Sequence, residues 1–359
     1  MIEKRKIEIP EYIDNRRPVS VKSMGNIKQI TISDRQNTGA TIKPISGKEY
    51  MIVSTGEIKE ITHHAHDRTE NVRNLEKTMR NLRDLINTNV TPYNIKRVRF
   101  LTLTYRENMQ DAQKLYTDYR DFNKRLKRYI QKEYGLSYEY IVCVEAQGRG
   151  AFHLHVIAIF SKPPPFIENT VLADIWRHGF VSIKSLDSNI DNIGAYLTAY
   201  LSDLDIESGV PLSHDLLQGE IREVQTEQAE NKHVIKGARL KLLPVGLNIY
   251  RCSRGIKKPF VEKMSYGDAL EEISSTGYKK VHESAVKIKD SERDFSSTYI
   301  SQIYKKHINT EFRCNGSDKK TENSKKKNQK RKISLKTTTK HSKIKSRKIP
   351  NTTIESYTT

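Results

Sequence analysis

Two histidines near the middle of the chain have the spacing of a metal site. His153 and His155 flank Leu154 in the run AFHLHVIAIF. If this run is a strand, its side chains alternate between two faces, so both imidazoles share one face with Cα atoms ~6–7 Å apart. Neutral imidazole is a good ligand for divalent cations. The pair therefore predicts a metal site, and the alternative is two sheet histidines that bind no ion.

Glu145 is the candidate for a third, oxygen ligand. It precedes the turn QGRG (147–150), which would connect the histidine strand to the strand before it. A four-residue loop would place Glu145 opposite Phe152, on the face away from the histidines. A three- or five-residue loop, or a bulge, would place it beside His153. In the same turn, Arg149 is a candidate contact for a phosphate.

Tyr196 and Tyr200 are the candidate nucleophiles. They are four residues apart in a segment, 188–205, whose apolar spacing predicts a helix, so their side chains would lie one turn apart, ~6 Å along the axis. A phenol with a pKa of ~10 is a weak nucleophile at neutral pH. A cation that polarises a phosphate would offset that weakness. The alternative is that both are ordinary tyrosines beside a buried stripe.

The elements around these residues predict a mixed α+β fold. Residues 98–104, 138–146, 151–160 and 180–186 have the patterns of strands, and residues 111–133 and 166–177 those of helices. The resulting order, β-α-β-β-α-β, is typical of a ferredoxin-like antiparallel sheet with helices on one face. That sheet would hold the histidines on a rigid central strand.

The rest of the chain divides into flanking segments. Strand signals in KQITIS, a hairpin at 49–61 with its turn at Thr55-Gly56, and a helix at 67–87 come first; a strand pair is expected in KGARLKLLPVGLNIYRCSRGIKKP. We predict an N-terminal extension (1–90), a catalytic core (91–206), an accessory part (207–312) and a disordered Lys-rich tail (313–359).

A net charge of +20 favours a polyanionic partner, nucleic acid above all. The tail, 313–359, accounts for +12 of it, with 15 Lys or Arg against three acids, so a solvated tail is the competing explanation. Before the tail, several cations are candidate phosphate contacts, with a solvated sheet edge as the alternative. They are Lys184, Lys236, Arg239, Arg251, Arg254, Lys257 and Lys258.

The cysteines and the hydropathy pattern limit the classes of protein. The three cysteines include no C-x-x-C pair, which argues against a disulfide framework and a cysteine zinc site. We see no signal peptide at the start of the sequence and no apolar run of the ~20 residues that a membrane span requires. We therefore expect a soluble, cytoplasmic bacterial protein with no membrane contact and no nucleotide cofactor.

Taken together, these motifs resemble those of the His-hydrophobic-His (HUH) replication initiators of rolling-circle plasmids, mobile elements and small phages. FLTLTY (100–105) is similar to the family's first motif, VEAQGRGAFHLHVIAIF to its second, and IGAYLTAYLSD to its third. Upstream helical stretches and IYRCSRGIKKP extend the similarity over roughly 67–262.

The resemblance implies a DNA-nicking endonuclease and strand transferase of the two-tyrosine type. Carried over, His153, His155 and Glu145 become ligands of Mn²⁺ or Mg²⁺, and Tyr196 and Tyr200 the nucleophiles. The enzyme would nick a single-stranded or cruciform origin, form a 5′-phosphotyrosine, and leave a 3′-hydroxyl for a host polymerase working with a host helicase. One departure is that the family's lysine near the tyrosines is replaced, since Ala199 and Asp203 occupy those positions.

Two other functions compete with this interpretation. A transposase or conjugative relaxase would perform the same phosphotyrosine chemistry for a different purpose. A non-catalytic nucleic-acid-binding protein would use the sheet only to hold strands, and it predicts exposed aromatic side chains on the sheet face. The histidines of the motif strand disfavour this second alternative.

Overall fold

A computed structural model of the protein describes a large part of the chain. The described residues are 2–35, 42–61, 72–147, 150–186, 194–195, 197–198, 204–205, 221–225, 231–235, 242–290 and 295–306. The chain divides into two units, residues 1–307 and 308–359, and the second lies outside the described residues. The predicted disordered tail, 313–359, therefore also lies outside them.

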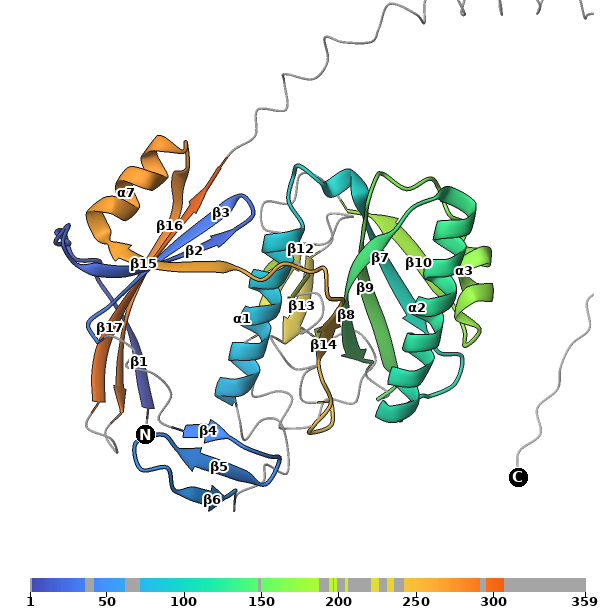
Figure 1. Ribbon diagram of the computed structural model, residues 1–359, viewed down its shortest axis with the longest axis horizontal. Coiled ribbons are helices and arrows are strands. Elements are labelled where there is room, and N and C mark those ends of the chain that lie inside the picture. The colour runs from blue at the N-terminus through green and yellow to red at the C-terminus, as the bar shows by residue number, and fades with distance from the viewer. Residues whose placement is uncertain are drawn as a thin grey trace, which may run out of the picture. The chain divides into compact units, whose positions relative to one another are not determined.

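A five-stranded antiparallel sheet carries the histidine motif (Figure 1). Its strand order is β10-β7-β9-β8-β14. These strands are β10 (Val181–Ser185), β7 (Val98–Thr104), β9 (Phe152–Phe160), β8 (Tyr138–Ala146) and β14 (Tyr250–Cys252). With helices α2 and α3 between them, β7, β8, β9 and β10 follow the predicted β-α-β-β-α-β order, so the α+β, ferredoxin-like prediction is confirmed.

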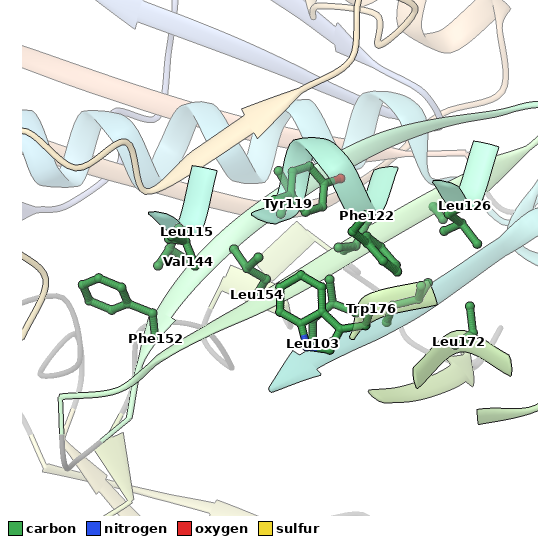
Figure 2. Packing of buried hydrophobic residues seen from close by; sticks show 14 of the residues in the cluster. Leu103, Leu115, Tyr119, Phe122, Leu126, Val144, Phe152, Leu154, Leu172 and Trp176 are labelled. Atoms are coloured by element: carbon green, nitrogen blue, oxygen red, sulfur yellow. The ribbon is translucent and has the colours of Figure 1, made fainter. Parts of the chain in front are cut away.

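Helices α2 (Ala112–Tyr134) and α3 (Asn169–Trp176) cover one face of this sheet. The α2 helix begins after Asp111, whose carboxylate accepts hydrogen bonds from two backbone N–H groups, and it ends at Gly135, with φ +63°. Apolar side chains of both helices interdigitate with alternate residues of the strands (Figure 2). Leu103, Leu154 and Trp176 are among the most deeply buried of them.

The opposite face of the sheet packs against helix α1 (Val72–Asn89). Leu82 and Ile86 of this helix are fully buried in one cluster with Phe100 of β7 and Ile157 of β9. Figure 1 shows α1 and α2 on opposite sides of the sheet. We call the α1 side the metal face and the α2 side the core face, because strand alternation places His153 and His155 on the α1 side.

A six-stranded antiparallel sheet combines residues from two distant parts of the chain. In order across the sheet its strands are β1 (Ile2–Ile7), β16 (Lys279–Asp290), β17 (Phe295–Lys305), β3 (Ile27–Ser33), β2 (Pro18–Met24) and β15 (Phe260–Ser265). Helix α7 (Tyr266–Ser275) covers one face, with Val21, Ile30 and Ile300 in the shared core. Segments that the sequence places in the N-terminal extension and in the accessory part therefore form one sheet.

The remaining elements are short. They are β4 (Ile42–Pro44), β5 (Glu49–Ile52) and β6 (Ile58–Glu60) in one three-stranded sheet, β11 (Leu204–Asp205), β12 (Ile221–Gln225) and β13 (Asn231–Ile235) in another, and the 3₁₀ turn η2 (Ile95–Arg97). The predicted hairpin at 49–61 is confirmed as β5 and β6. Gly56 at its turn has φ +73°, a conformation that favours glycine.

Two predicted elements differ from the structure. The helix predicted over 188–205 does not reach its expected end, because Leu204 and Asp205 form β11 and pair with β13. The strand pair predicted around 250 is also wrong in its partner, since β14 pairs with β8 at the edge of the five-stranded sheet. In both cases a strand that is distant in the sequence supplies the backbone hydrogen bonds, and local propensity contains no information about such a partner.

Candidate metal centre

The hairpin between β8 and β9 places Glu145 beside His153. The two strands pair Ala146 with Phe152 and Glu145 with His153, so the loop has five residues. Within it Gly150 has φ +82°, and its N–H donates to the Gln147 carbonyl oxygen at 2.8 Å. Of the loop lengths considered from the sequence, the four-residue loop is therefore wrong, and the five-residue loop sets the side of the sheet on which Glu145 lies.

Glu145, His153 and His155 form a three-residue cluster with the character of a metal site. One ligand atom from each residue lies within 4.8 Å of the others. The two imidazole rings have centroids 6.5 Å apart and planes inclined by 61°. Glu145 and His155 are buried, whereas His153 is only partly buried, so the cluster opens to solvent on the His153 side.

His155 is held on every side by neighbouring groups. Its Nδ1 lies 3.2 Å from the Thr102 hydroxyl on β7, and its Nε2 contacts the Glu145 carboxylate. Phe100 stacks on the imidazole at 5.3 Å between centroids. Burial lowers the pKa of His155 to about 4, so the ring is neutral at neutral pH. A neutral, oriented imidazole whose second nitrogen meets a hydroxyl has the features of a metal ligand.

The donor set of this cluster suits a divalent cation. Two imidazole nitrogens and one carboxylate oxygen are borderline and hard donors, a combination found with zinc, manganese and related ions. Three protein ligands leave further coordination positions for water or a substrate oxygen. The contact between Glu145 and His155 Nε2 fits this view, because the same two atoms that share a proton can share a cation.

The segment that carries the tyrosines reaches the metal face in its described part. Residues 194, 195, 197 and 198 are helical. Leu197 is 1% exposed and belongs to the cluster that contains Phe100 and Ile157. The Gly194 N–H donates to the Asn87 side-chain oxygen of α1 at 2.9 Å. A Cβ atom at Gly194 would lie 2.6 Å from the Arg83 carbonyl oxygen, so glycine permits this close approach. Tyr196 and Tyr200 themselves lie outside the described residues.

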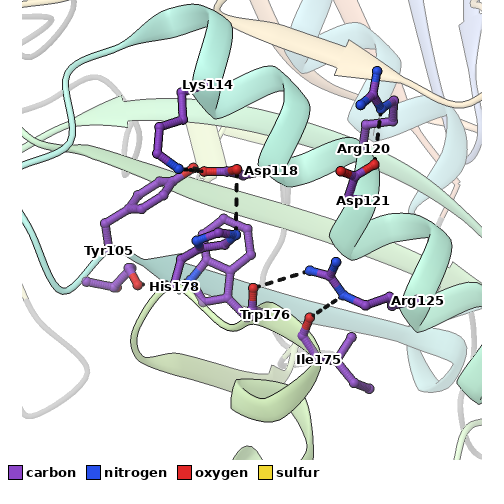
Figure 3. Close-up of polar contacts among 10 residues, drawn as sticks. Tyr105, Lys114, Asp118, Arg120, Asp121, Arg125, Ile175, Trp176 and His178 are labelled. Atoms are coloured by element: carbon purple, nitrogen blue, oxygen red, sulfur yellow. Dashed lines mark hydrogen bonds and ion pairs between the residues drawn. The ribbon is translucent and has the colours of Figure 1, made fainter.

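A polar network on the core face anchors the end of β7 (Figure 3). The Tyr105 hydroxyl donates to Asp118 of α2 at 3.1 Å, and Lys114 donates to the same carboxylate at 2.9 Å. His178 lies 3.6 Å from the other Asp118 oxygen. Burial, followed by the charge of Asp118, raises the pKa of Tyr105 far above its ordinary value. This phenol therefore stays protonated and serves as a structural donor.

Residues 98–205 match the model of a family of replication-associated proteins, described as ORF2 or gene-2 proteins. The matched segment begins at β7 and ends at β11, and it contains all three residues of the metal cluster. No curated protein and no solved structure matches the chain. The family match supports a replication-associated protein of the initiator type that acts on DNA.

The described cations predicted to contact DNA lie on different sides of the five-stranded sheet. Lys184 of β10 is exposed and is paired with Phe100, which places it on the metal face. Arg251 of β14 lies on the core face, with its guanidinium 3.3 Å from the centre of the Tyr116 ring. Arg254, Lys257 and Lys258 are exposed in the segment after β14. Arg149, Lys236 and Arg239 lie outside the described residues.

The sequence prediction missed Thr102 as part of the site. Thr102 is directly paired with His155, and Thr104 with His153. A signal for both was present, because they are the polar members of the otherwise apolar strand 98–104 and alternate with Leu101 and Leu103. As for membranes, none of the helices in the described part of the chain has the length and apolar character needed to cross a bilayer.

Proposed function

We propose that the protein is a rolling-circle replication initiator, a metal-dependent endonuclease and ligase that nicks one DNA strand with a tyrosine. The observation that carries this proposal is the convergence of Glu145, His153 and His155 on one small volume, within the segment that matches replication-associated proteins. The opening on the His153 side supplies access for a substrate phosphate. We assign Mn²⁺ or Mg²⁺ as the ion.

The proposed reaction is a transesterification at a DNA phosphate. The phenol oxygen of Tyr196 or Tyr200, after loss of its proton to water, attacks phosphorus, and the bond from phosphorus to the 3′ oxygen breaks. The 3′ oxygen takes up a proton and becomes the hydroxyl that primes a host polymerase. Because one phosphodiester replaces another, rejoining needs no ATP. A cation in the cluster would act as a Lewis acid on the phosphate.

The chain's own residues orient the reacting groups in this proposal. Thr102 and Phe100 hold the His155 ring, and the pairing of β8 with β9 holds Glu145 beside His153. Ala195 and Leu197, the neighbours of Tyr196 in the chain, belong to a helical segment, and Leu197 packs into the core of the metal face. That location of Leu197 supports the assignment of Tyr196 and Tyr200 as nucleophiles near the cluster.

Two tyrosines serve two successive cleavages in this proposal. One opens the origin, and the other cuts the regenerated origin after a full round of synthesis. Since Ala199 and Asp203 stand where a lysine is expected, another cation must stabilise the phosphate or the leaving oxygen. We assign that role to Lys184, Arg254 or Arg149, and the remaining phosphate contacts to Lys236, Arg239, Arg251, Lys257 and Lys258.

Trapping the covalent intermediate tests the proposal directly. The full chain is incubated with single-stranded origin DNA and Mn²⁺ or Mg²⁺, and adducts are mapped by mass spectrometry. We expect a DNA–tyrosine adduct that disappears in the double variant Tyr196→Phe/Tyr200→Phe, while the two single variants separate initiation from termination. Tyr93→Phe is the control, because Tyr93 is an exposed tyrosine outside the motif.

The rival functions predict different results in the same experiment. A non-catalytic binding protein gives no adduct with any divalent ion, and that result would reject the proposal. A transposase or relaxase gives the adduct as well, but it would not support repeated replication rounds from a plasmid origin. The family match to replication-associated proteins is the observation that favours an initiator.

A further inference from the structure

Edge strand β10 presents an aromatic side chain to the metal face of the five-stranded sheet. Ser182 and Lys184 of β10 pair with Thr102 and Phe100. One step before the strand, the Phe180 carbonyl oxygen accepts from the Thr104 N–H at 2.9 Å, so Phe180 continues the same ladder. The next residue, Val181, packs against the core-face cluster. Side-chain alternation therefore places Phe180, Ser182 and Lys184 together on the metal face.

Phe180 lies in the same cross-strand row as the metal cluster. Thr104 pairs with Phe180 on one side and with His153 on the other, and His153 pairs with Glu145. Two strand spacings separate Phe180 from His153, or roughly 10 Å. One or two nucleotides of an extended strand bridge such a distance. A phosphate at the cluster would thus bring a neighbouring base over the Phe180 ring.

Phe180 is exposed, yet its backbone is rigidly held. Its side chain is 71% exposed. At the preceding position, a Cβ atom on Gly179 would lie 2.3 Å from the Thr104 carbonyl oxygen, so only glycine allows the two strands to approach here. One residue earlier, His178 accepts the Arg106 N–H at its carbonyl oxygen and faces Asp118 with its ring (Figure 3). Folding therefore fixes a large apolar ring in solvent, which costs free energy unless a partner covers it.

We propose that Phe180 is a stacking platform for a base of single-stranded DNA next to the scissile phosphate, with Lys184 contacting the backbone. The proposal rests on the proposed function, since it takes single-stranded DNA as the substrate. Bases stack on exposed aromatic rings irrespective of sequence, and lysine neutralises phosphate. The neighbours of Phe180 on this face of β10 are a hydroxyl and a cation, which suits a nucleotide. A protein partner would instead require a contiguous apolar patch.

Fluorescence of a base analogue tests the stacking contact. A single-stranded oligonucleotide containing a fluorescent adenine analogue, which is quenched on stacking, is titrated with the full chain in chelator to prevent cleavage. We expect quenching with the wild type and its loss in Phe180→Ala, with affinity falling about 5- to 150-fold. Phe180→Trp should retain both. Lys184→Ala should retain quenching and lower the slope of log K against log salt by about 0.7.

The control variant is Phe166→Ala, which removes another exposed phenylalanine, 84% exposed, from the same sheet's connections. It should change neither quenching nor affinity. Equal effects of Phe166→Ala and Phe180→Ala, or quenching that persists in Phe180→Ala, would overturn the stacking proposal even if adducts form. Conversely, quenching that depends on Phe180 in a protein that never forms an adduct would retain the stacking contact and reject the nicking function.

Discussion

The two faces of the five-stranded sheet come from alternate residues of the same strands, but they differ in what they bury. On the core face, β9 contributes Leu154 and Val156, which pack with α2 and α3 in a wholly apolar cluster. On the metal face, the same strand runs from Ile157, buried under α1, to His155 and then to the partly exposed His153. The metal face thus changes from apolar to polar along the strand.

This difference shows how a rigid sheet can support a reactive site. The apolar half of the metal face holds the first imidazole, since Phe100 stacks on His155 and burial keeps that ring neutral. The polar half leaves the second imidazole accessible to a phosphate. The core face supplies the stability that permits this, because a sheet packed on one side can leave polar groups partly uncovered on the other.

The largest effect should follow from removing a ligand on the metal face. His153→Ala should reduce adduct formation below detection and greatly weaken Mn²⁺ binding in calorimetry, since only two ligands remain. The free energy of unfolding should fall by less than about 1 kcal/mol, because His153 is partly exposed. His282→Ala, at an exposed position of β16, is the control. Undiminished cleavage by His153→Ala would refute the metal centre.

The neighbouring residue on the core face should behave in the opposite way. Leu154→Ala removes a side chain that is 2% exposed and should lower the free energy of unfolding by about 2–5 kcal/mol, measured in urea. At temperatures where this variant stays folded, the ligands remain in place, so adduct formation per folded molecule should be retained. A loss of adducts without a loss of stability would contradict the division between the two faces.

The smallest effect should come from the contact that orients His155. Thr102→Val keeps the shape of the side chain but removes the hydroxyl that lies 3.2 Å from His155 Nδ1. We expect the affinity for Mn²⁺ to fall about 10- to 100-fold, with little change in thermal unfolding of the metal-free protein. Thr102→Ser, which restores the hydroxyl, should recover most of the affinity. If both variants bind equally, Thr102 does not orient the ligand.

Much of the local structure was predictable. The strands predicted at 98–104 and 138–146 are β7 and β8, and the helix predicted at 111–133 is α2, shifted by one residue. These segments alternate with a period of 2 or recur with a period near 3.6, so each identifies its own buried face. The histidine pair was found for the same reason. Tyr196 and Tyr200 lie outside the described residues, and their role stays a prediction.

Pairing between distant segments was not predictable in the same way. The edge strand β14 pairs with β8, and residues near both the start and the end of the described chain form the six-stranded sheet. Backbone hydrogen bonds are nearly the same for every residue type, so a strand's sequence seldom identifies its partner. Phe180 was missed because its value as a platform depends on the strands beside it.

The sequence by itself determined that His153 and His155 share one face of a strand, because side-chain alternation is a property of any extended chain. Only the tertiary structure decided that Glu145 joins them, since that depends on a five-residue loop whose backbone conformation sets the register. It also decided that Thr102 and Phe100 surround His155. Ligand types are encoded residue by residue, whereas their convergence depends on hydrogen bonds between strands that are separated in the chain.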